Sequence, residues 1–123
     1  MNKLVEQQCR YDDDGKRPLE MEEIKALQDQ VLAWDVNEQG TKIARTFHFK
    51  NYYHTMNFVN AIAWIANKEA HHPDMQVSYG HCEVVFTTHD SGNRLTINDF
   101  ICAAKVDDLL NAGNFGPKLV DEA

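Results

Sequence analysis

The chain has 123 residues, of which 43% are hydrophobic and 25% charged, a composition that suits one globular domain with a modest core. The net charge of -7 argues against nucleic-acid binding as the main task, because such surfaces are usually basic. No apolar stretch reaches the about 20 residues of a membrane span, and the N-terminus lacks the apolar core of a signal peptide. The three cysteines are an odd set without metal-motif spacing, which predicts reduced thiols. We therefore expect a cytoplasmic protein without a membrane or nucleic-acid partner.

The N-terminal part is expected to be less ordered than the rest. Residues 1–17 are polar and rich in turn formers, so we expect a partly irregular lead-in with little to bury. A single domain is predicted over residues 18–113, followed by a tail over residues 114–123. The domain begins with a helix from Leu19 to Gln30, because its apolar residues follow helical spacing and Pro18 can occupy a first helical turn.

A hairpin and a long helix follow. The apolar alternation predicts strands at residues 34–36 and 42–49, joined by a turn at residues 37–40. From Asn51 to Ala70 the period becomes helical. The residues on its apolar face are Tyr52, Met56, Val59, Ile62, Ala63, Ala66 and Ala70, widened by Phe58 and Ile65. Pro73 prevents continuation of this helix, so His71 and His72 are expected at its exit.

The second half repeats the pattern. Strands are predicted at residues 75–79 and 82–88, with a turn or bulge at Gly80-His81, and a loop at residues 89–93. The last helix begins at Thr96 and ends at Gly113. The order α-β-β-α-β-β-α predicts an α+β two-layer sandwich, in which a four-stranded antiparallel sheet carries three helices on one face. Such a sheet leaves edges that a partner chain can extend.

Three histidines stand at predicted element ends. Imidazole exchanges protons near neutral pH, so His71, His72 and His89, together with Tyr79 and Thr88, predict a shared acid/base pocket. Each feature also has an ordinary explanation. The histidine pair can simply stabilise the end of a helix dipole, and His89 can be a polar surface residue.

Other chemistries are less well supported by the sequence. A metal site fits poorly, because His81 and His89 are separated by about 25 Å of extended chain. Cys82 lies in a predicted strand and Cys102 in a predicted helix, as structural cysteines do.

Asp99 and the two tryptophans have more than one possible role. Asp99 can cap the last helix or orient the imidazole of His89, and capping is the favoured interpretation. Trp34 and Trp64 are expected in the core.

The run Glu69-Ala70-His71-His72-Pro73, then Tyr79, Thr88-His89 and Asp99, resembles the signature of pterin-4a-carbinolamine dehydratases, of the bacterial type. The similarity extends from Leu19 to Asn111 and includes the start of the hairpin at Trp34 and the Phe-Val-Asn-Ala-Ile-Ala segment at residues 58–63. This chain differs from animal members in having Asn67 and Ala70 where they have acidic residues. The loop after His89 is also one residue longer.

The resemblance implies a fold with a four-stranded antiparallel sheet and three helices, homodimers or homotetramers, and dehydration of 4a-hydroxytetrahydropterins in support of aromatic amino acid hydroxylases. Metal and organic cofactors are not required for this chemistry. The catalytic residues implied are His71, His72, His89 and Asp99. The substrate-binding residues implied are Ala70, His71, His72, Pro73, Tyr79, Thr87, Thr88, His89 and Asp90. The alternative is a non-catalytic interaction module of the transcriptional coactivator type, for which three histidines would not be needed.

Overall fold

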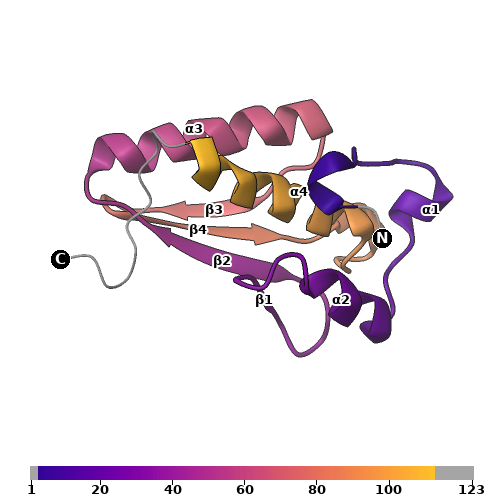
Figure 1. Ribbon diagram of the computed structural model, residues 1–123. Helices are drawn as coiled ribbons and strands as arrows, with labels where there is room; N and C mark the ends of the chain where they lie inside the picture. Colours follow the sequence, from indigo (N-terminus) through magenta and orange to yellow (C-terminus); the bar gives the residue numbers. More distant parts are fainter. Residues whose placement is uncertain (1–2, 113–123) are drawn as a thin grey trace.

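The computed structural model describes residues 3–112, in which helices pack against a single sheet (Figure 1). The elements in chain order are η1 Leu4–Glu6, α1 Asp13–Lys16, α2 Met21–Gln28, β1 Asp35–Val36, β2 Ile43–His48, α3 Tyr52–Glu69, β3 Asp74–Val77, β4 His81–Phe86, η2 His89–Ser91, α4 Ile97–Asp108 and η3 Leu109–Ala112. The predicted helix end at Gly113 and the predicted tail from Asn114 lie outside the described residues. None of the helices within residues 3–112 has the length and apolar character needed to cross a membrane.

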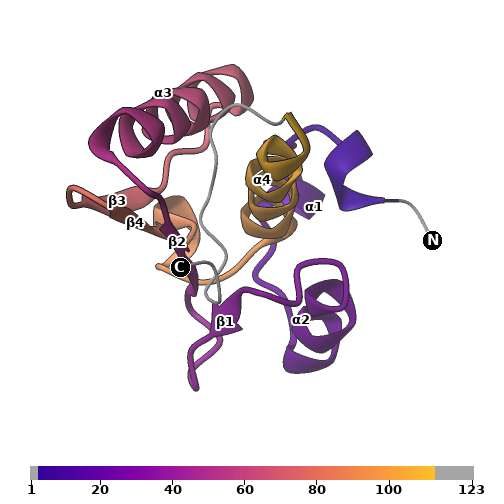
Figure 2. The same ribbon diagram turned by 60° about the vertical axis from the view of Figure 1, so that its left-hand side comes forward.

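The four strands form one antiparallel sheet in the order β1-β2-β4-β3. Strand β2 pairs with β4 along its whole length, from Ile43 opposite Phe86 to His48 opposite His81. Helices α3 and α4 lie over one face of this sheet, and α2 lies beside β1 (Figures 1 and 2). The predicted α+β fold is confirmed. The boundaries differ by a few residues: α2 begins at Met21, beyond Pro18, and His81 belongs to β4 rather than to a turn.

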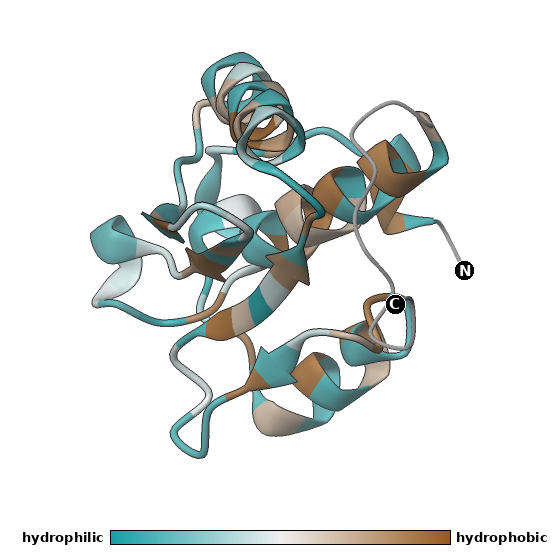
Figure 3. Ribbon diagram, turned by 90° about the vertical axis from the view of Figure 1, so that its left-hand side faces the viewer, coloured by the Kyte–Doolittle hydropathy of each residue, from teal (hydrophilic) through white to brown (hydrophobic). Residues whose placement is uncertain are grey.

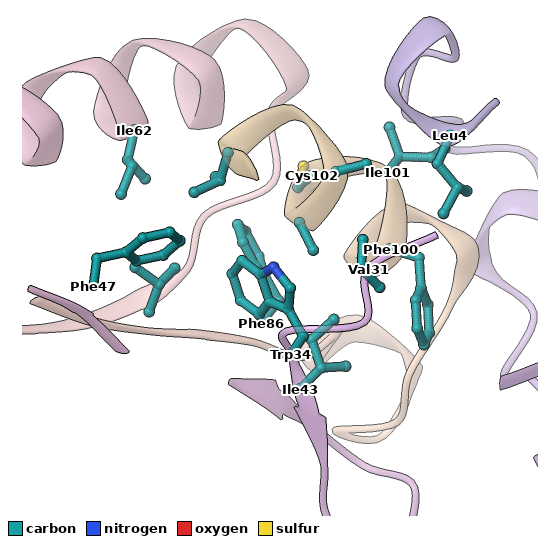
Figure 4. Packing of buried hydrophobic residues seen from close by; sticks show 14 of the residues in the cluster. Leu4, Val31, Trp34, Ile43, Phe47, Ile62, Phe86, Phe100, Ile101 and Cys102 are labelled. Atoms are coloured by element: carbon teal, nitrogen blue, oxygen red, sulfur yellow. The ribbon is translucent and has the colours of Figure 1, made fainter. Parts of the chain in front are cut away.

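The core is built around Trp34, which is fully buried as expected. Its ring contacts Phe47 at a centroid distance of 6.1 Å and Phe86 at 5.9 Å (Figure 4). The indole Nε1 donates a hydrogen bond to Asp107 Oδ1 at 2.8 Å, and Arg45 Nη1 donates to the same oxygen at 2.8 Å. Burial raises the pKa of Asp107, and its two donors act in the opposite direction. One carboxylate on α4 therefore joins this helix to β2 and to the central indole.

Helix α3 occupies the predicted range, but its buried face is rotated from the predicted one. Hydrophobic and hydrophilic residues both occur along this helix (Figure 3). The buried residues are Thr55, Phe58, Ile62, Ile65, Ala66 and Glu69. The prediction that Trp64 lies in the core is wrong, since its side chain is 65% exposed, and Tyr52 is also exposed. The apolar pattern missed Thr55 and Glu69 because their polar atoms have partners inside the protein. Thr55 Oγ1 donates to the backbone oxygen of Tyr79 at 2.8 Å.

The N-terminal segment buries more than the sequence predicts. Leu4 is fully buried, and its backbone N–H donates to Gln30 Oε1 at 2.8 Å. Lys105 Nζ on α4 donates to the Val5 carbonyl at 3.0 Å. The expectation that this segment has little to bury is wrong, since Leu4 enters the core. Polar side chains from distant elements hold the segment there by binding its backbone. The domain division at residues 17 and 113 stays a prediction.

Replacing Leu4 tests whether the first residues are part of the cooperative fold. We expect Leu4→Ala to lower the free energy of unfolding by about 3 kcal/mol, as for other fully buried leucines. Leu32→Ala is the matched control, because Leu32 is 77% exposed, and it should change stability by less than about 0.5 kcal/mol. Urea denaturation followed by circular dichroism measures both, and equal stability of the two variants would mean that the segment is detached from the core in solution.

Candidate active site

A pocket of about 190 Å³ lies where the end of α3, the end of β4 and the N-terminal segment meet. Its lining residues are Tyr11, Lys16, Ala70, His71, His72, Thr87, Thr88, His89, Asp90 and Asn98. The three predicted histidines therefore share one pocket. A larger hollow of about 410 Å³ between α3 and α4 has no histidine in its lining.

The sheet topology explains why these residues meet. Strand β3 is antiparallel to β4, with Asp74 opposite Val85, so the start of β3 and the end of β4 lie at the same end of the sheet. The His71-His72 pair directly precedes β3, and Thr87 to His89 directly follow β4. Helix α4 begins shortly afterwards and brings Asp99 to the same place.

His71 is held by a buried carboxylate. Its Nε2 lies 2.6 Å from Asp99 Oδ1, and the two side chains are 9% and 0% exposed. The imidazole also stacks on Phe86, with centroids 5.9 Å apart and an angle of 11° between the ring planes. Asp99 occupies Nε2, so Nδ1 is the other ring nitrogen of His71. A carboxylate in this position fixes the ring orientation and stabilises the imidazolium that forms on proton uptake.

Asp99 caps α4, which was the favoured of the two roles considered for it. Its Oδ2 accepts from the backbone N–H of Thr96 at 2.9 Å, which completes the predicted capping box of α4. The same oxygen accepts from Thr88 Oγ1 at 2.8 Å. The imidazole that Asp99 binds is that of His71, so the alternative role, in which Asp99 orients His89, is wrong. The capping position turns the carboxylate towards the end of α3, and His89 lies on the separate short helix η2.

The other two histidines are exposed at the rim. His72 Nε2 lies 3.0 Å from Asn67 Oδ1, and His89 Nδ1 lies 2.8 Å from Asn93 Oδ1. With the amide oxygens as acceptors, both rings donate to asparagine and keep one nitrogen for other partners. The pocket thus combines one buried imidazole backed by a carboxylate with two solvent-accessible imidazoles.

Two predicted substrate-binding residues do not line this pocket. Tyr79 lies in the turn between β3 and β4, at the opposite end of the sheet, and its ring stacks on Tyr52 with centroids 6.1 Å apart. The prediction that β3 continues to Tyr79 is wrong, because the strand ends at Val77. The structure therefore does not bring Tyr79 to the histidines of its own chain. Pro73 ends α3 as predicted but does not line the pocket.

Three residues that line the pocket were not predicted from the sequence. Tyr11 and Lys16 belong to the N-terminal segment that was expected to be irregular, and Asn98 lies in the first turn of α4. Asn98 binds this segment, since its Oδ1 accepts from Arg10 N at 2.9 Å and its Nδ2 donates to Arg10 O at 2.8 Å. The one feature of the sequence that could have indicated this part of the pocket is Tyr11, an aromatic residue directly before three aspartates. Its partners lie far along the chain, so the local pattern does not reveal its role.

The cysteines do not provide a nucleophile here. Burial raises the pKa of Cys82 to about 11. A hydrogen bond with Cys9, together with burial, raises the pKa of Cys102 well above its usual value. Both groups therefore stay as thiols, which are poor nucleophiles. Among residues 3–112, no group of three or more His, Cys, Asp or Glu side chains is arranged to hold a metal ion.

Comparison with known proteins gives consistent matches. A family model described as pterin 4 alpha carbinolamine dehydratase matches residues 17–109. A Nitrosomonas europaea protein named pterin-4-alpha-carbinolamine dehydratase is 51% identical over 110 residues, covering 89% of this chain and 95% of the relative. A Legionella pneumophila protein of the same name is 58% identical over 93 residues, covering 75% and 81%. The crystal structure of a transcriptional coactivator/pterin dehydratase from Brucella melitensis has a TM-score of 0.71 at 27% identity, covering 76% of this chain and 98% of the other.

Replacing Asp99 by asparagine tests the buried carboxylate. An amide offers one acceptor oxygen in place of two, so either the His71 side or the threonine side loses its acceptor. We expect a loss of about 2 kcal/mol in unfolding free energy, the cost of an unsatisfied buried group. The nitrogen resonances of His71, measured by NMR, should also move. Asp90→Asn is the matched control, because Asp90 lines the same pocket but is exposed. Similar small effects in both variants would contradict this assignment.

Proposed function

The chain belongs to the pterin-4a-carbinolamine dehydratase family and is a hydro-lyase, and we propose that it dehydrates 4a-hydroxytetrahydropterins to quinonoid dihydropterins by histidine acid/base catalysis. The observation that carries this proposal is the buried pair of His71 and Asp99 in a pocket that also holds His72 and His89. A pocket with imidazoles in two different environments suits a reaction that needs a proton acceptor and a proton donor together.

The reaction requires two proton movements. The departing 4a-hydroxyl leaves as water once its oxygen has received a proton. The ring nitrogen N5 loses its proton, and the electron pair of the N5–H bond forms the new C=N double bond to C4a as the C–O bond breaks. Atoms and charge therefore balance without an external oxidant or reductant. Each of the two proton transfers can accelerate the reaction by about 10²- to 10⁴-fold when a side chain carries it out.

His71 is the proposed proton acceptor for N5. Its Nε2 faces Asp99 Oδ1 at 2.6 Å, so Nδ1 is the atom that receives the proton. The carboxylate lies directly behind the ring and stabilises the resulting imidazolium, as in other carboxylate–imidazole pairs. Stacking holds the imidazole of His71 nearly parallel to the Phe86 ring. The imidazole therefore needs little reorientation during the reaction.

His89 is the proposed proton donor to the hydroxyl, and His72 positions the substrate. The Nδ1 of His89 faces Asn93, so Nε2 remains for the leaving oxygen. Its exposure allows a new proton to come from solvent after each turnover. His72 is held by Asn67, and its second nitrogen is available for a hydrogen bond to the pterin. Thr87, Thr88, Asp90 and Ala70 line the remaining walls.

The proposed roles are tested by replacing each histidine. We expect His71→Ala and His89→Ala to fold and each to lose at least about 10²-fold in catalysed rate, because each removes one proton transfer. The double variant should be slower than either single variant but less than multiplicatively so. Stopped-flow decay of 4a-hydroxytetrahydropterin measures the rates, and circular dichroism checks the fold.

His48→Ala is the control for removing an imidazole from the surface. His48 is exposed on β2, opposite His81 of β4, and its loss should leave the rate unchanged. Wild-type rates in both folded single variants of the pocket would contradict the acid/base assignment. If wild-type protein does not speed the decay of 4a-hydroxytetrahydropterin over the rate without protein, the dehydratase proposal is contradicted.

The cellular role proposed is recycling of the pterin used by an aromatic amino acid hydroxylase. The quinonoid product is an oxidised dihydropterin, so a reductase must act before the pterin can serve again. A reducing cytoplasm is the proposed compartment. Its support is that Cys9, Cys82 and Cys102 are all free, even though the first and the last have sulfur atoms 3.5 Å apart.

A coactivator-type role remains the alternative. The name of the Brucella melitensis structure includes transcriptional coactivator as well as pterin dehydratase. Such a role would depend on an outer surface and would not require a buried carboxylate behind His71. The His71→Ala variant discriminates the two, since it should lose at least about 10²-fold in catalysed rate and leave any partner binding intact.

We further propose that the chain forms homodimers or homotetramers through an edge of its sheet. Strand β1 has only two residues, whereas β3 has four and is the other edge of the described sheet. Its outer backbone groups can pair with a second copy of the same strand, and Val77 adds an exposed apolar side chain there.

Sedimentation velocity tests this association directly. At micromolar concentration we expect a mass of two or four times the 14.1 kDa of one chain. A mass of 14.1 kDa throughout the concentration range would contradict it.

A further inference from the structure

The N-terminal segment contacts both sides of the histidine pocket. The Tyr11 hydroxyl donates to the carbonyl oxygens of Glu69 and Ala70, the last residues before His71. At the other end of the segment, the Lys16 carbonyl accepts from Ser91 Oγ at 2.6 Å, and Ser91 closes the short helix that begins with His89. We call residues 9–16 the strap. The strap therefore connects the segment after α3, which carries the proposed proton acceptor His71, with η2, which carries the proposed proton donor His89. Figure 1 shows this segment at the end of the molecule where α3 ends.

The strap is firmly anchored to the body of the protein. Cys9 N donates to Glu69 Oε1 at 2.8 Å, and the backbone of Arg10 exchanges two hydrogen bonds with the Asn98 side chain. The chain then folds back on itself so closely that a Cβ at Gly15 would lie 2.1 Å from the Arg10 carbonyl oxygen. Only glycine fits there, so a fixed conformation between Arg10 and Lys16 is built into the sequence.

The contact of Tyr11 falls on a strained point of the backbone. Ala70 ends α3 in the left-handed conformation, with φ 54° and ψ 39°. This conformation costs a residue with a Cβ about 1–2 kcal/mol relative to the right-handed one and persists only where surrounding contacts hold it. The N–H groups of Ala70 and His71 both donate to Ala66 O. Tyr11 binds the carbonyls on the other side of the same turn, which directs His71 towards Asp99.

Tyr11 is suited to this task as a permanent donor. Partial burial, followed by the neighbouring Cys9, raises the pKa of its phenol above the usual value. The hydroxyl therefore keeps its proton throughout the physiological range.

We propose that the strap sets the relative positions of His71 and His89, with Tyr11 acting as a positioning residue through the left-handed turn at Ala70. This inference rests on the proposed function for its catalytic consequence. The family match begins only at residue 17, so the strap lies before the part of the chain that the family defines.

Tyr11→Phe removes the hydroxyl and keeps the ring. We expect kcat and kcat/KM to fall together by about fivefold, with KM changed by less than about twofold, because a misplaced imidazole weakens interactions made in the transition state. The imidazole resonances of His71 in NMR spectra should shift, while those of His48 stay in place. Tyr53→Phe is the matched control, since Tyr53 is 80% exposed on α3, and it should leave both readouts unchanged.

A second substitution separates positioning from a purely structural effect. Glycine adopts the left-handed conformation without a Cβ penalty, so Ala70→Gly in the Tyr11→Phe background should return kcat to within about twofold of wild type and reverse the His71 shift. A Tyr11→Phe variant with a lower Tm but wild-type kcat and unshifted His71 resonances would overturn the proposal. Rate loss that Ala70→Gly does not restore would also overturn it.

The test distinguishes this inference from the proposed function. If wild-type protein does not dehydrate the pterin, the proposed function fails, and the His71 resonances still decide whether the strap positions that ring. If wild type is active, His71→Ala is inactive and Tyr11→Phe equals wild type in rate and in spectrum, the function stands and the strap proposal fails.

Discussion

The arrangement of the whole site depends on one buried carboxylate. Asp99 is fully buried, and a charge without partners at such a position would cost several kcal/mol. Its partners come from three different elements: the backbone of Thr96 at the start of α4, the Thr88 hydroxyl after β4, and His71 after α3. Satisfying one anion therefore joins the ends of two helices and a strand. The pocket lies at this junction, where the contacts of the carboxylate fix His71 beside the end of β4 that carries His89.

The sequence was most informative where one side chain decides the local conformation. Asn51 starts α3 and Pro73 prevents its continuation, so the position of His71 after this helix was predictable. The Thr96–Asp99 capping box was likewise readable from spacing alone. The shared pocket of the histidines was expected from their placement at the ends of predicted elements. What these patterns did not reveal is the partner of each side chain, because the Asp99–His71 contact spans 28 positions of the chain.

The errors share a physical cause, which is polar atoms satisfied over long distances. Glu69 is not part of the predicted apolar face, yet it is buried, and the Cys9 backbone donates to its carboxylate. The expectation that the lead-in has little to bury failed for a related reason: side chains of Gln30 and Asn98, far along the chain, bind its backbone. Trp64 was expected in the core by residue type, but the actual buried face of α3 is set by Phe58 and its helical neighbours. Apolar periodicity cannot register a buried face that includes hydrogen-bonded polar residues.

The different surroundings of two identical side chains are the physical basis of the acid and base roles proposed for them. His71 and His89 have the same chemistry in isolation, so a division of roles has to come from their environments. His71 is enclosed between Asp99 and Phe86, where an anion favours the ring that has gained a proton. His89 faces solvent, which can replace a proton it has given away. Both lie at the ends of elements, and only His71 is buried and stacked on a core ring, Phe86. Hydrogen bonds between Asp99 and His71 and between Asn93 and His89 hold the two rings in addition, so polar contacts complete a site that the core alone does not build.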